Sequence, residues 1–420
     1  MNFAIVANRL RDQIARFSGI LSEGLPKKAR KFVREMVYGI QARESVRLTE
    51  IARAQQENIS LKKTQERLSR QLKRPQLGGV LQRDLIRLAS EHVTKGALLI
   101  VDIGDISKRY ARKMEYLDRI RDGSEKVIAN GYWLCTVIAT YHNSDKTVPI
   151  YNKLYSTKAK GFISENDEIK KAIRDVSDGV KSEGTWVIDR GGDRKELFEF
   201  LLDRGDRFII RLRGNRFLEH GTKRLPALHL AQMTRLPYSE YIVEEREDEE
   251  KVKRIEFGCL KVRLPNRSDS LFLLVVAGFG EQPLMLLTNE SLRRNRKVLL
   301  RILRGYIKRW EIEKTFRFIK QSYEIEDVRV LGYAGLQNMM VIVMAVAYFA
   351  MVVLDNGSKM RVMLGHIYRM AKRVFGVPDF RYYAIADGIM ALLTRHPGRV
   401  VGRKDRGKKL QLALGLVPGG

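Results

Sequence analysis

Three acidic residues lie far apart in the sequence, each in a segment where an acid is unexpected. Asp102 ends the apolar segment ALLIVD, and Asp189 ends the apolar segment TWVID. Glu313 lies in YIKRWEIEKTFRFIK, in which five residues are basic and four are large aromatics. Acids at the ends of buried strands are costly unless they are paired or bind a metal ion. One such acid is commonly a turn residue or helix cap, but three of them predict a shared site.

Three carboxylates suit the chemistry of Mg²⁺, which prefers oxygen ligands and keeps several waters. Two such ions about 3.5–4 Å apart can activate an attacking oxygen and stabilise a leaving one. The six histidines show no metal-ligand spacing. The two cysteines, Cys135 and Cys259, are too few for a zinc site, and we expect both in strands as small buried residues. The pattern favours Mg²⁺-dependent phosphodiester cleavage.

Helical geometry separates the two glutamates of this segment. We expect a basic helical stretch from Ser291 to Lys320, with 11 Lys and Arg and only two acids. At about 100° per residue, Glu313 shares a face with basic residues, whereas Glu311 lies on another side. The shared face gathers Tyr306, Arg309, Glu313, Arg317 and Lys320. Such a stripe is commonly a surface ion-pair ladder. The two strand acids favour Glu313 as the third member of a site.

The net charge of +29 and the pI of about 10.1 indicate a polyanionic partner. Nucleic acid is the first candidate, and a ribosomal or membrane-surface protein is the alternative. The apolar run Met339–Leu354 has 16 residues, fewer than the ~20 of a membrane helix. We therefore expect a buried helix or strand there, no membrane association, and a soluble protein in a reducing, intracellular compartment.

Residues 1–92 look helical and basic, with 17 Lys and Arg against 7 Asp and Glu up to position 80. Ser45–Leu72 reads as two short helices with a break near Glu57 and Asn58 and with Ser60 as an N-cap. This is compatible with a helix-turn-helix, and an ordinary helical bundle with a solvated face has equal weight. In the first interpretation the second helix contacts DNA through Lys62, Lys63, Arg67 and Arg70.

The rest of the chain alternates strands and helices. Residues 96–105, 131–141 and 147–156 read as strands, the first pairs antiparallel. A helix with Asn166 as its cap and a helix closed by Gly205 follow, separated by the strand that ends at Asp189. We expect a catalytic core in residues 93–213 and 285–355, a β-strand insertion in 214–284, and a helical and basic region in 356–420 that is a candidate for dimerisation. The last residues, from 402, are basic and Gly-rich, and we expect them to be loose.

The late helix also carries a family resemblance. Tyr306, Arg309, Glu313 and Lys320 match the pattern Y-x2-R-x3-E-x6-K, which resembles the signature of bacterial insertion-sequence transposases of the YREK group in the DDE superfamily. The order of strand Asp, strand Asp and helix Glu agrees, as does the β insertion between Asp189 and Glu313. The resemblance covers about residues 95–330.

The resemblance implies an α/β fold: an RNase H-like mixed five-stranded sheet with flanking helices. It implies Asp102, Asp189 and Glu313 as ligands of two Mg²⁺ ions, with Mn²⁺ as a substitute. It further implies that Tyr306, Arg309 and Lys320 hold phosphates near the cut end. Trp310 is a candidate for stacking on a base, with core packing as the favoured alternative.

Several positions leave alternatives open. Asp105 follows Asp102 closely, and Asp102 is preferred because it directly ends the apolar run. Asp193 is a weaker alternative to Asp189. The cationic residues near the expected site are further candidates for binding DNA: Arg190, Arg211 and Arg213. Some members of the resembled family place a tryptophan in the β insertion to hold a flipped base. None of the three tryptophans lies there, so the resemblance does not decide whether cleavage passes through a DNA hairpin.

The sequence thus predicts a transposase that binds the inverted terminal repeats of an insertion sequence and cuts and rejoins DNA. Its partners would be double-stranded DNA, at the transposon ends and the target, and a second copy of the chain. It would act in the bacterial cytoplasm at the nucleoid. The alternatives are another RNase H-like nuclease such as a resolvase, a non-catalytic DNA-binding protein derived from a transposase, and a basic RNA-binding or ribosome-associated protein.

Overall fold

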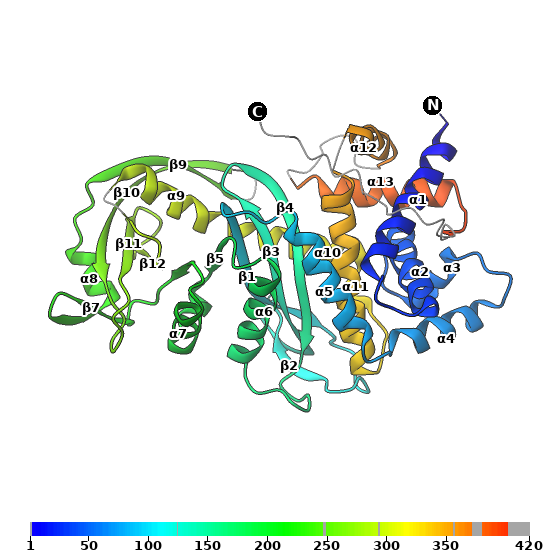
Figure 1. The fold of residues 1–420 in the computed structure, drawn as a ribbon, viewed down its shortest axis with the longest axis horizontal. Helices are drawn as coiled ribbons and strands as arrows, with labels where there is room; N and C mark the ends of the chain where they lie inside the picture. Colours follow the sequence, from blue (N-terminus) through cyan, green and yellow to red (C-terminus); the bar gives the residue numbers. More distant parts are fainter. Residues whose placement is uncertain are drawn as a thin grey trace.

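The structure is a computed structural model that describes residues 2–123, 125–246, 249–292, 295–355, 358–371 and 380–401. The predicted loose tail, residues 402–420, lies outside the described residues. The chain begins with a group of helices, which lies at one end of the molecule in Figure 1. These helices are α1 (Phe3–Leu21), α2 (Lys27–Arg43), α3 (Leu48–Ala54), α4 (Leu61–Leu72) and α5 (Leu77–Ser90).

A mixed sheet forms the centre of the molecule. Its central strands are β1 (Ala97–Ser107), β3 (Ile128–Tyr141), β4 (Ser144–Tyr155), β5 (Thr185–Ile188) and β6 (Phe208–Arg211). They lie in the order β4-β3-β1-β5-β6, with β3 antiparallel to both of its long neighbours and β1, β5 and β6 parallel. This arrangement confirms the predicted RNase H-like sheet and its antiparallel first strands. A short strand that we did not predict, β2 (Asp118–Arg121), pairs with the start of β3.

The β-rich insertion continues this sheet. From β6 outward the strands are β12 (Leu284–Thr288), β11 (Leu271–Ala277), β10 (Glu249–Val262) and β9 (Tyr238–Arg246). Each pairs antiparallel with its neighbour, giving one ten-stranded sheet. A hairpin of β7 (Phe217–His220) and β8 (Lys223–Pro226) and the helix α8 (Ala227–Met233) lie beside it. Both cysteines lie in strands as predicted, Cys135 buried in β3 and Cys259 half-buried in β10.

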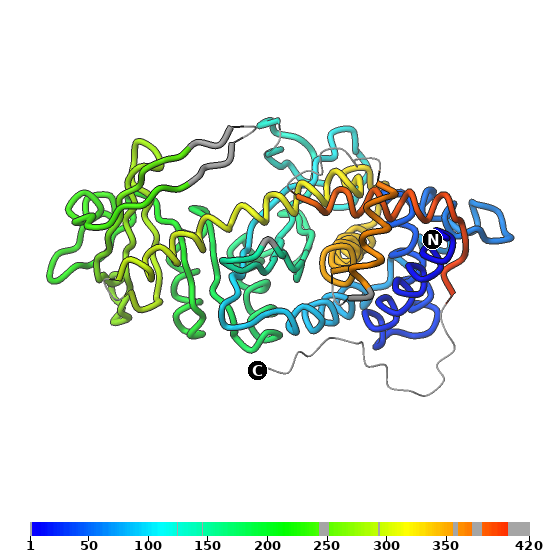
Figure 2. The backbone as a smooth tube through the Cα atoms, turned by 90° about the horizontal axis from the view of Figure 1, so that it is seen from above, coloured from blue at the N-terminus to red at the C-terminus, as the bar shows by residue number. Residues whose placement is uncertain are grey.

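Helices cover the two faces of the central sheet. On one face lie α6 (Glu165–Gly179) and α7 (Lys195–Arg204), and Trp186 of β5 donates to Ser177 of α6 at 3.1 Å. On the other face α9 (Arg296–Ile307) and α10 (Trp310–Tyr323) follow one another across the sheet (Figure 2). Gly205 ends α7 with a φ of 71°, as predicted. The cap of α6 is Ser164, which accepts from Asp167 N, so the predicted cap Asn166 is wrong by two residues.

The long apolar run is a core helix. α11 (Tyr333–Tyr348) continues through a π-helical segment, Phe349–Val353. These 21 residues are long and apolar enough to cross a membrane, but 89% of the apolar window is buried inside the protein. The N-terminal helices cover part of it, and Tyr348 donates to Leu88 O of α5 at 3.0 Å. The prediction of a buried segment is confirmed. Two further helices, α12 (Ser358–Met370) and α13 (Tyr382–Arg395), complete the described chain.

Candidate active site

The register of the sheet brings two of the predicted acids to the same level. β1 and β5 run parallel and pair Leu98 with Thr185 and Ile100 with Val187. When this pairing is continued by two more residues along each strand, Asp102 lies beside Asp189. Contrary to the sequence-based expectation, β1 does not end at Asp102, because β3 continues to pair with it as far as Ser107. The pairing between β1 and β5 does end at Ile100, so both carboxylates lie where the two strands separate.

Glu313 reaches this point from a helix that is interrupted. The predicted single helix is wrong: α9 ends at Ile307, and α10 begins at Trp310. α10 lies close against β1, since a Cβ added at Gly104 would lie 2.6 Å from the Phe316 ring. Glu313 is in the first turn of α10, and its Oε1 accepts from Arg309 Nη1 at 2.8 Å. Gly104 and Asp102 share a face of β1 because side chains alternate along a strand.

The electrostatics of Asp102 show that the three acids influence one another. Burial first, and then the negative charge of Asp189, raise the pKa of Asp102 to about 7. Arg309 acts in the opposite direction, and Glu313 adds a smaller increase. Strand spacing also puts Thr136 opposite Asp102 on β3. Carboxylates this close repel one another, so a cation between them would favour their ionised forms.

The donor chemistry of this cluster fits Mg²⁺, although the side chains are not arranged around an ion. Among the described residues, no group of three His, Cys, Asp or Glu side chains is close enough to hold a metal ion as it stands. Asp189 Oδ1 accepts from Gly191 N at 2.7 Å, and Glu313 is paired with Arg309. Ligation would require both carboxylates to change these contacts. The raised pKa of Asp102 is the observation that favours a cation here.

A cleft of about 550 Å³ opens beside these acids. Asp102 and Glu313 lie in its wall, together with Arg317 and Lys320 of α10. The neighbouring candidate Asp105 also lines it, but Asp105 is bonded to Lys320 Nζ at 3.1 Å and to Gly123 N at 3.2 Å. These contacts give Asp105 a structural role and favour Asp102 as the ligand candidate.

Asp193, the alternative to Asp189, also has structural partners. Its carboxylate accepts from Arg216 Nε at 2.6 Å and from Arg213 N at 2.7 Å. The side chain is almost fully buried, with 1% of its surface exposed. These two bonds join the turn after β5 to the loop after β6, which leaves Asp189 as the acid that faces Asp102.

Comparison with known families agrees with this geometry. Residues 163–350 match the family model described as the transposase DDE domain. The match includes Asp189 and Glu313 and begins after Asp102. The predicted DDE transposase family is thus confirmed, whereas the YREK group and the bacterial origin stay predictions.

A solved structure is also similar to this transposase: a piggyBac transposase synaptic complex with hairpin DNA. The similarity covers 91% of this chain and 77% of that chain, with a TM-score of 0.43 and 11% sequence identity. No curated protein matches the chain in sequence.

The other residues of the predicted signature in the transposase are less exposed than a phosphate-binding role suggests. Tyr306 lies in α9 with 8% of its surface exposed. Arg309 pairs with Glu313, and Lys320 pairs with Asp105 and Glu326 at 3.1 Å each. Arg317 is the exposed member of the set. Arg309 and Lys320 therefore position acids and the wall of the cleft, and Tyr306 is a buried residue of α9.

Trp310 corrects a further expectation. Core packing was the favoured interpretation, yet Trp310 is 56% exposed at the start of α10. The guanidinium of Arg309 lies 5.1 Å from the centre of its ring, a distance typical of a cation–π contact. The other face of the ring is therefore available to a planar partner. The further candidates Arg190, Arg211 and Arg213 are exposed around the same end of the sheet.

The predicted DNA-contacting helix of the transposase has its expected ends. α3 and α4 flank the predicted break, and Ser60 caps α4 by accepting from Lys63 N at 3.4 Å. Arg67, however, bonds to Glu35 at 2.6 Å and to Glu57 at 2.7 Å. This ion-pair network joins α2 to α4, so Arg67 is not available as a phosphate contact. The remaining candidates are exposed: Lys62, Lys63 and Arg70.

Sequence reasoning missed Glu326, which lines the active-site cleft. Its carboxylate accepts from Ser107 N at 3.2 Å and pairs with Lys320. Glu326 lies in a 3₁₀ segment, Ile325–Asp327, directly after α10. No spacing pattern marks this position, because its partners on β1 are more than 200 residues away in the chain.

Proposed function

We propose that this chain catalyses metal-dependent cleavage and strand transfer of DNA, with Asp102, Asp189 and Glu313 as the metal ligands. The observation that supports the proposal is the electrostatic coupling of these three acids, of which Asp102 and Glu313 line one cleft. Two of them belong to the segment that matches the transposase DDE domain. Hard carboxylate ligands without an adjacent histidine or thiolate are the set that Mg²⁺ selects, with Mn²⁺ as a substitute.

In this mechanism two bound Mg²⁺ ions would activate the attacking oxygen and stabilise the leaving one. Asp102, whose pKa is raised to about 7, exchanges a proton near neutral pH, and its ionised form would be a ligand for a cation. Arg309 orients Glu313 through their ion pair, which leaves one carboxylate oxygen of Glu313 for a ligand. Lys320 ties Asp105 to Glu326 and keeps the far wall of the cleft in place.

The substrate of this site would be double-stranded DNA at the inverted repeats of the element, followed by target DNA. Arg317 and Trp310 on the exposed side of α10 are suited to a phosphate and a base respectively. Lys62, Lys63 and Arg70 of α4 offer further phosphate contacts away from the cleft. Because two DNA ends must be joined, we propose a homodimer as the active complex, acting at the bacterial nucleoid.

The test uses the full chain, Mg²⁺ and DNA that carries the ends of the element. Wild-type protein should cut at the ends and join the freed 3′ end to a target. Asp189→Asn should lose both steps and keep DNA binding, measured by fluorescence anisotropy. Normal cutting by Asp189→Asn would refute the assignment. Cutting without joining would indicate another RNase H-like nuclease, and binding without cutting by wild type would indicate a non-catalytic DNA-binding protein.

A further inference from the structure

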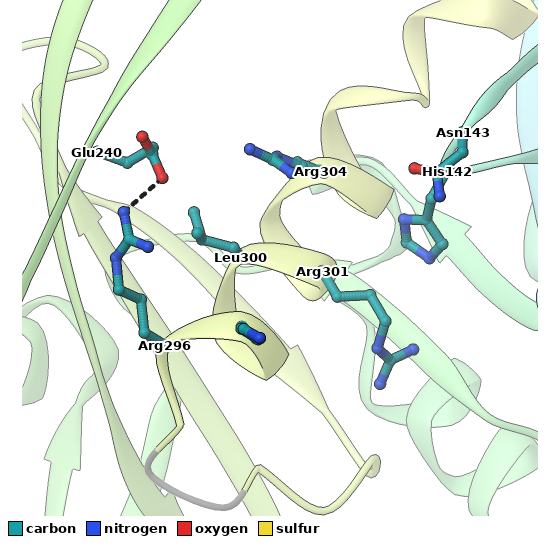
Figure 3. Close-up of a pocket in the computed structure, with 8 residues that line it drawn as sticks. His142, Asn143, Glu240, Arg296, Leu300, Arg301 and Arg304 are labelled. Carbon is teal, nitrogen blue, oxygen red and sulfur yellow. Dashed lines mark hydrogen bonds and ion pairs between the residues drawn. The ribbon is translucent and has the colours of Figure 1, made fainter.

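A second cleft lies away from the acids and carries the opposite charge. It has a volume of about 420 Å³ and is lined by α9, by the turn between β3 and β4, and by one residue of β9. Figure 3 shows Arg296, Leu300 and Arg304 on the side of α9 that faces the cleft, with His142 and Asn143 across from them. α9 contains four basic residues and no acid.

Two contacts hold the turn against α9 and so build the wall of this cleft. A Cβ at Gly305 would lie 2.8 Å from His142 Cε1, so glycine is what allows the ring to approach. Lys308 Nζ donates to Ser144 O at 3.3 Å. Burial lowers the pKa of His142, and the charges of Arg301 and Lys308 lower it further. The imidazole in the wall of the cleft is therefore neutral, and the positive charge of the cleft comes from the side chains of α9.

The cations of α9 divide into paired and unpaired ones. Arg296 bonds to Glu240 at 2.6 Å, and Arg301 bonds to Glu290 at 2.6 Å. Lys297 and Arg304 are exposed and have no acidic partner among the residues that the structure describes. Like charges three or four residues apart on a helix repel one another. These cations repel one another, so a bound polyanion would stabilise the cluster.

The position of α9 relates this cleft to the proposed catalytic acids. A Cβ at Gly305 would lie 3.3 Å from Leu98 Cδ2, so the end of α9 rests on β1. Leu98 and Asp102 point to the same face of β1, about 13 Å apart along the strand. The basic cleft therefore lies on the same face of the sheet as the acids. With DNA rising about 3.4 Å per base pair, a duplex at Asp102 needs roughly four more base pairs to reach α9.

We propose that Lys297 and Arg304 bind the phosphate backbone of duplex DNA on the catalytic face, several base pairs from the cut. The inference rests on the proposed function for the identity of the substrate. It adds a second DNA-contact surface, which is formed by α9 and the turn at His142. Exposed lysine and arginine side chains commonly contact phosphate oxygens, and such contacts position the duplex without reading its sequence.

The experiment measures the binding of a fluorescein-labelled duplex by the full chain without metal, as a function of salt. Each phosphate contact contributes about 0.9 to the slope of log K against log salt concentration. The double variant Lys297→Ala/Arg304→Ala should lower the slope by about 2. A matched control, Lys181→Ala/Lys195→Ala, removes the same charge from exposed sites near α6 and α7 and should leave the slope unchanged.

An unchanged slope in the α9 variant would overturn the inference, as would an equal decrease in the control. A decrease seen with single-stranded DNA but not with duplex would overturn the choice of partner. Circular dichroism confirms that each variant is folded, and Lys297→Gln/Arg304→Gln replaces the alanine pair if it is not. Because no metal or cleavage is involved, the result stands even if the proposed catalytic function fails.

Discussion

The acids around Asp102 and the cations of α9 lie on one face of the same sheet, and the two regions differ in the sign of the charge that has no ion-pair partner within the part of the chain that the structure describes. Around Asp102, burial and neighbouring carboxylates raise a pKa to about 7. On α9, Lys297 and Arg304 have no acidic partner among the described residues. A third region, α4, differs from both because Arg67 is neutralised by Glu35 and Glu57. Lys297 and Arg304 are therefore candidates for binding a ligand, whereas the paired Arg67 has a structural role.

The largest expected effect is a difference in DNA cleavage between variants of two glutamates in α10. Glu313→Gln should abolish DNA cleavage, because it removes a proposed metal ligand. Glu311→Gln, two residues earlier in α10, should retain most cleavage, since the ion pair of Glu311 within the described part of the chain is with Lys314 at 3.3 Å. Cleavage of end-bearing DNA in Mg²⁺ measures both. Equal losses in the two variants would mean that α10 contributes through its packing rather than through Glu313.

The acid cluster should also make stability depend on pH. Because the folded state raises the pKa of Asp102 to about 7 from 3.8, folding favours the protonated form. The free energy of unfolding should therefore be highest below about pH 4 from this group and should fall as pH rises to about 7. The difference corresponds to at most about 4 kcal/mol. Asp102→Asn should remove this decline in urea titrations across that range.

The effect of Mg²⁺ on the Tm is a second test of Asp102. In wild-type protein at neutral pH, added Mg²⁺ should raise the Tm, because the ion binds the ionised carboxylates of the folded state. Asp102→Asn should show a smaller rise, and Lys181→Ala should behave like wild type. A Tm that is insensitive to Mg²⁺ in wild type would contradict the proposed metal site.

Arg67→Ala tests the contrasting, structural use of a cation. Loss of its two ion pairs leaves Glu35, which is 5% exposed, without a strong partner. We expect a loss of about 2 kcal/mol in the free energy of unfolding, reduced from the fully buried case because Arg67 is partly exposed. Lys63→Ala, an exposed change on the same helix, should alter stability by less than about 0.5 kcal/mol. A weaker DNA affinity with unchanged stability in Arg67→Ala would reverse this assignment.

Trp310→Ala should produce the smallest effect, and on binding only. Its ring is 56% exposed, so stability should hardly change, while the affinity for DNA should fall by about 1 kcal/mol if a base stacks on it. Trp310→Phe keeps an aromatic face and should retain most of the affinity. A destabilised protein with normal affinity would instead support a packing role for Trp310.

Local patterns identified much of this architecture before the structure. The apolar runs that end in Asp102 and Asp189 are parallel neighbours, because buried strands read as continuous apolar segments. Gly205 marks a helix end since its positive φ is costly for other residues. The core position of α11 follows from its composition.

Other features of the fold depend on contacts between residues far apart in the sequence, so local patterns could not predict them. The break between α9 and α10 at Lys308 and Arg309 has no proline or glycine at that point. It arises where Gly305 packs against Leu98 and α10 turns to lie along β1. Arg67 finds Glu35 from 32 residues away, a pairing that no helical spacing indicates. The continuation of β1 beyond Asp102 depends in the same way on β3.

The buried position of α11 has a consequence for how this protein can be divided. Hydrogen bonds hold α11 to the N-terminal helices and to the sheet. Asn338 of α11 donates to Leu72 O of α4, and Asn152 of β4 donates to Met340 O of α11. Removing the helices before β1 would uncover a segment apolar enough for a lipid bilayer. A fragment without these helices should therefore aggregate or adhere to detergent micelles, so a fragment made for expression should keep them.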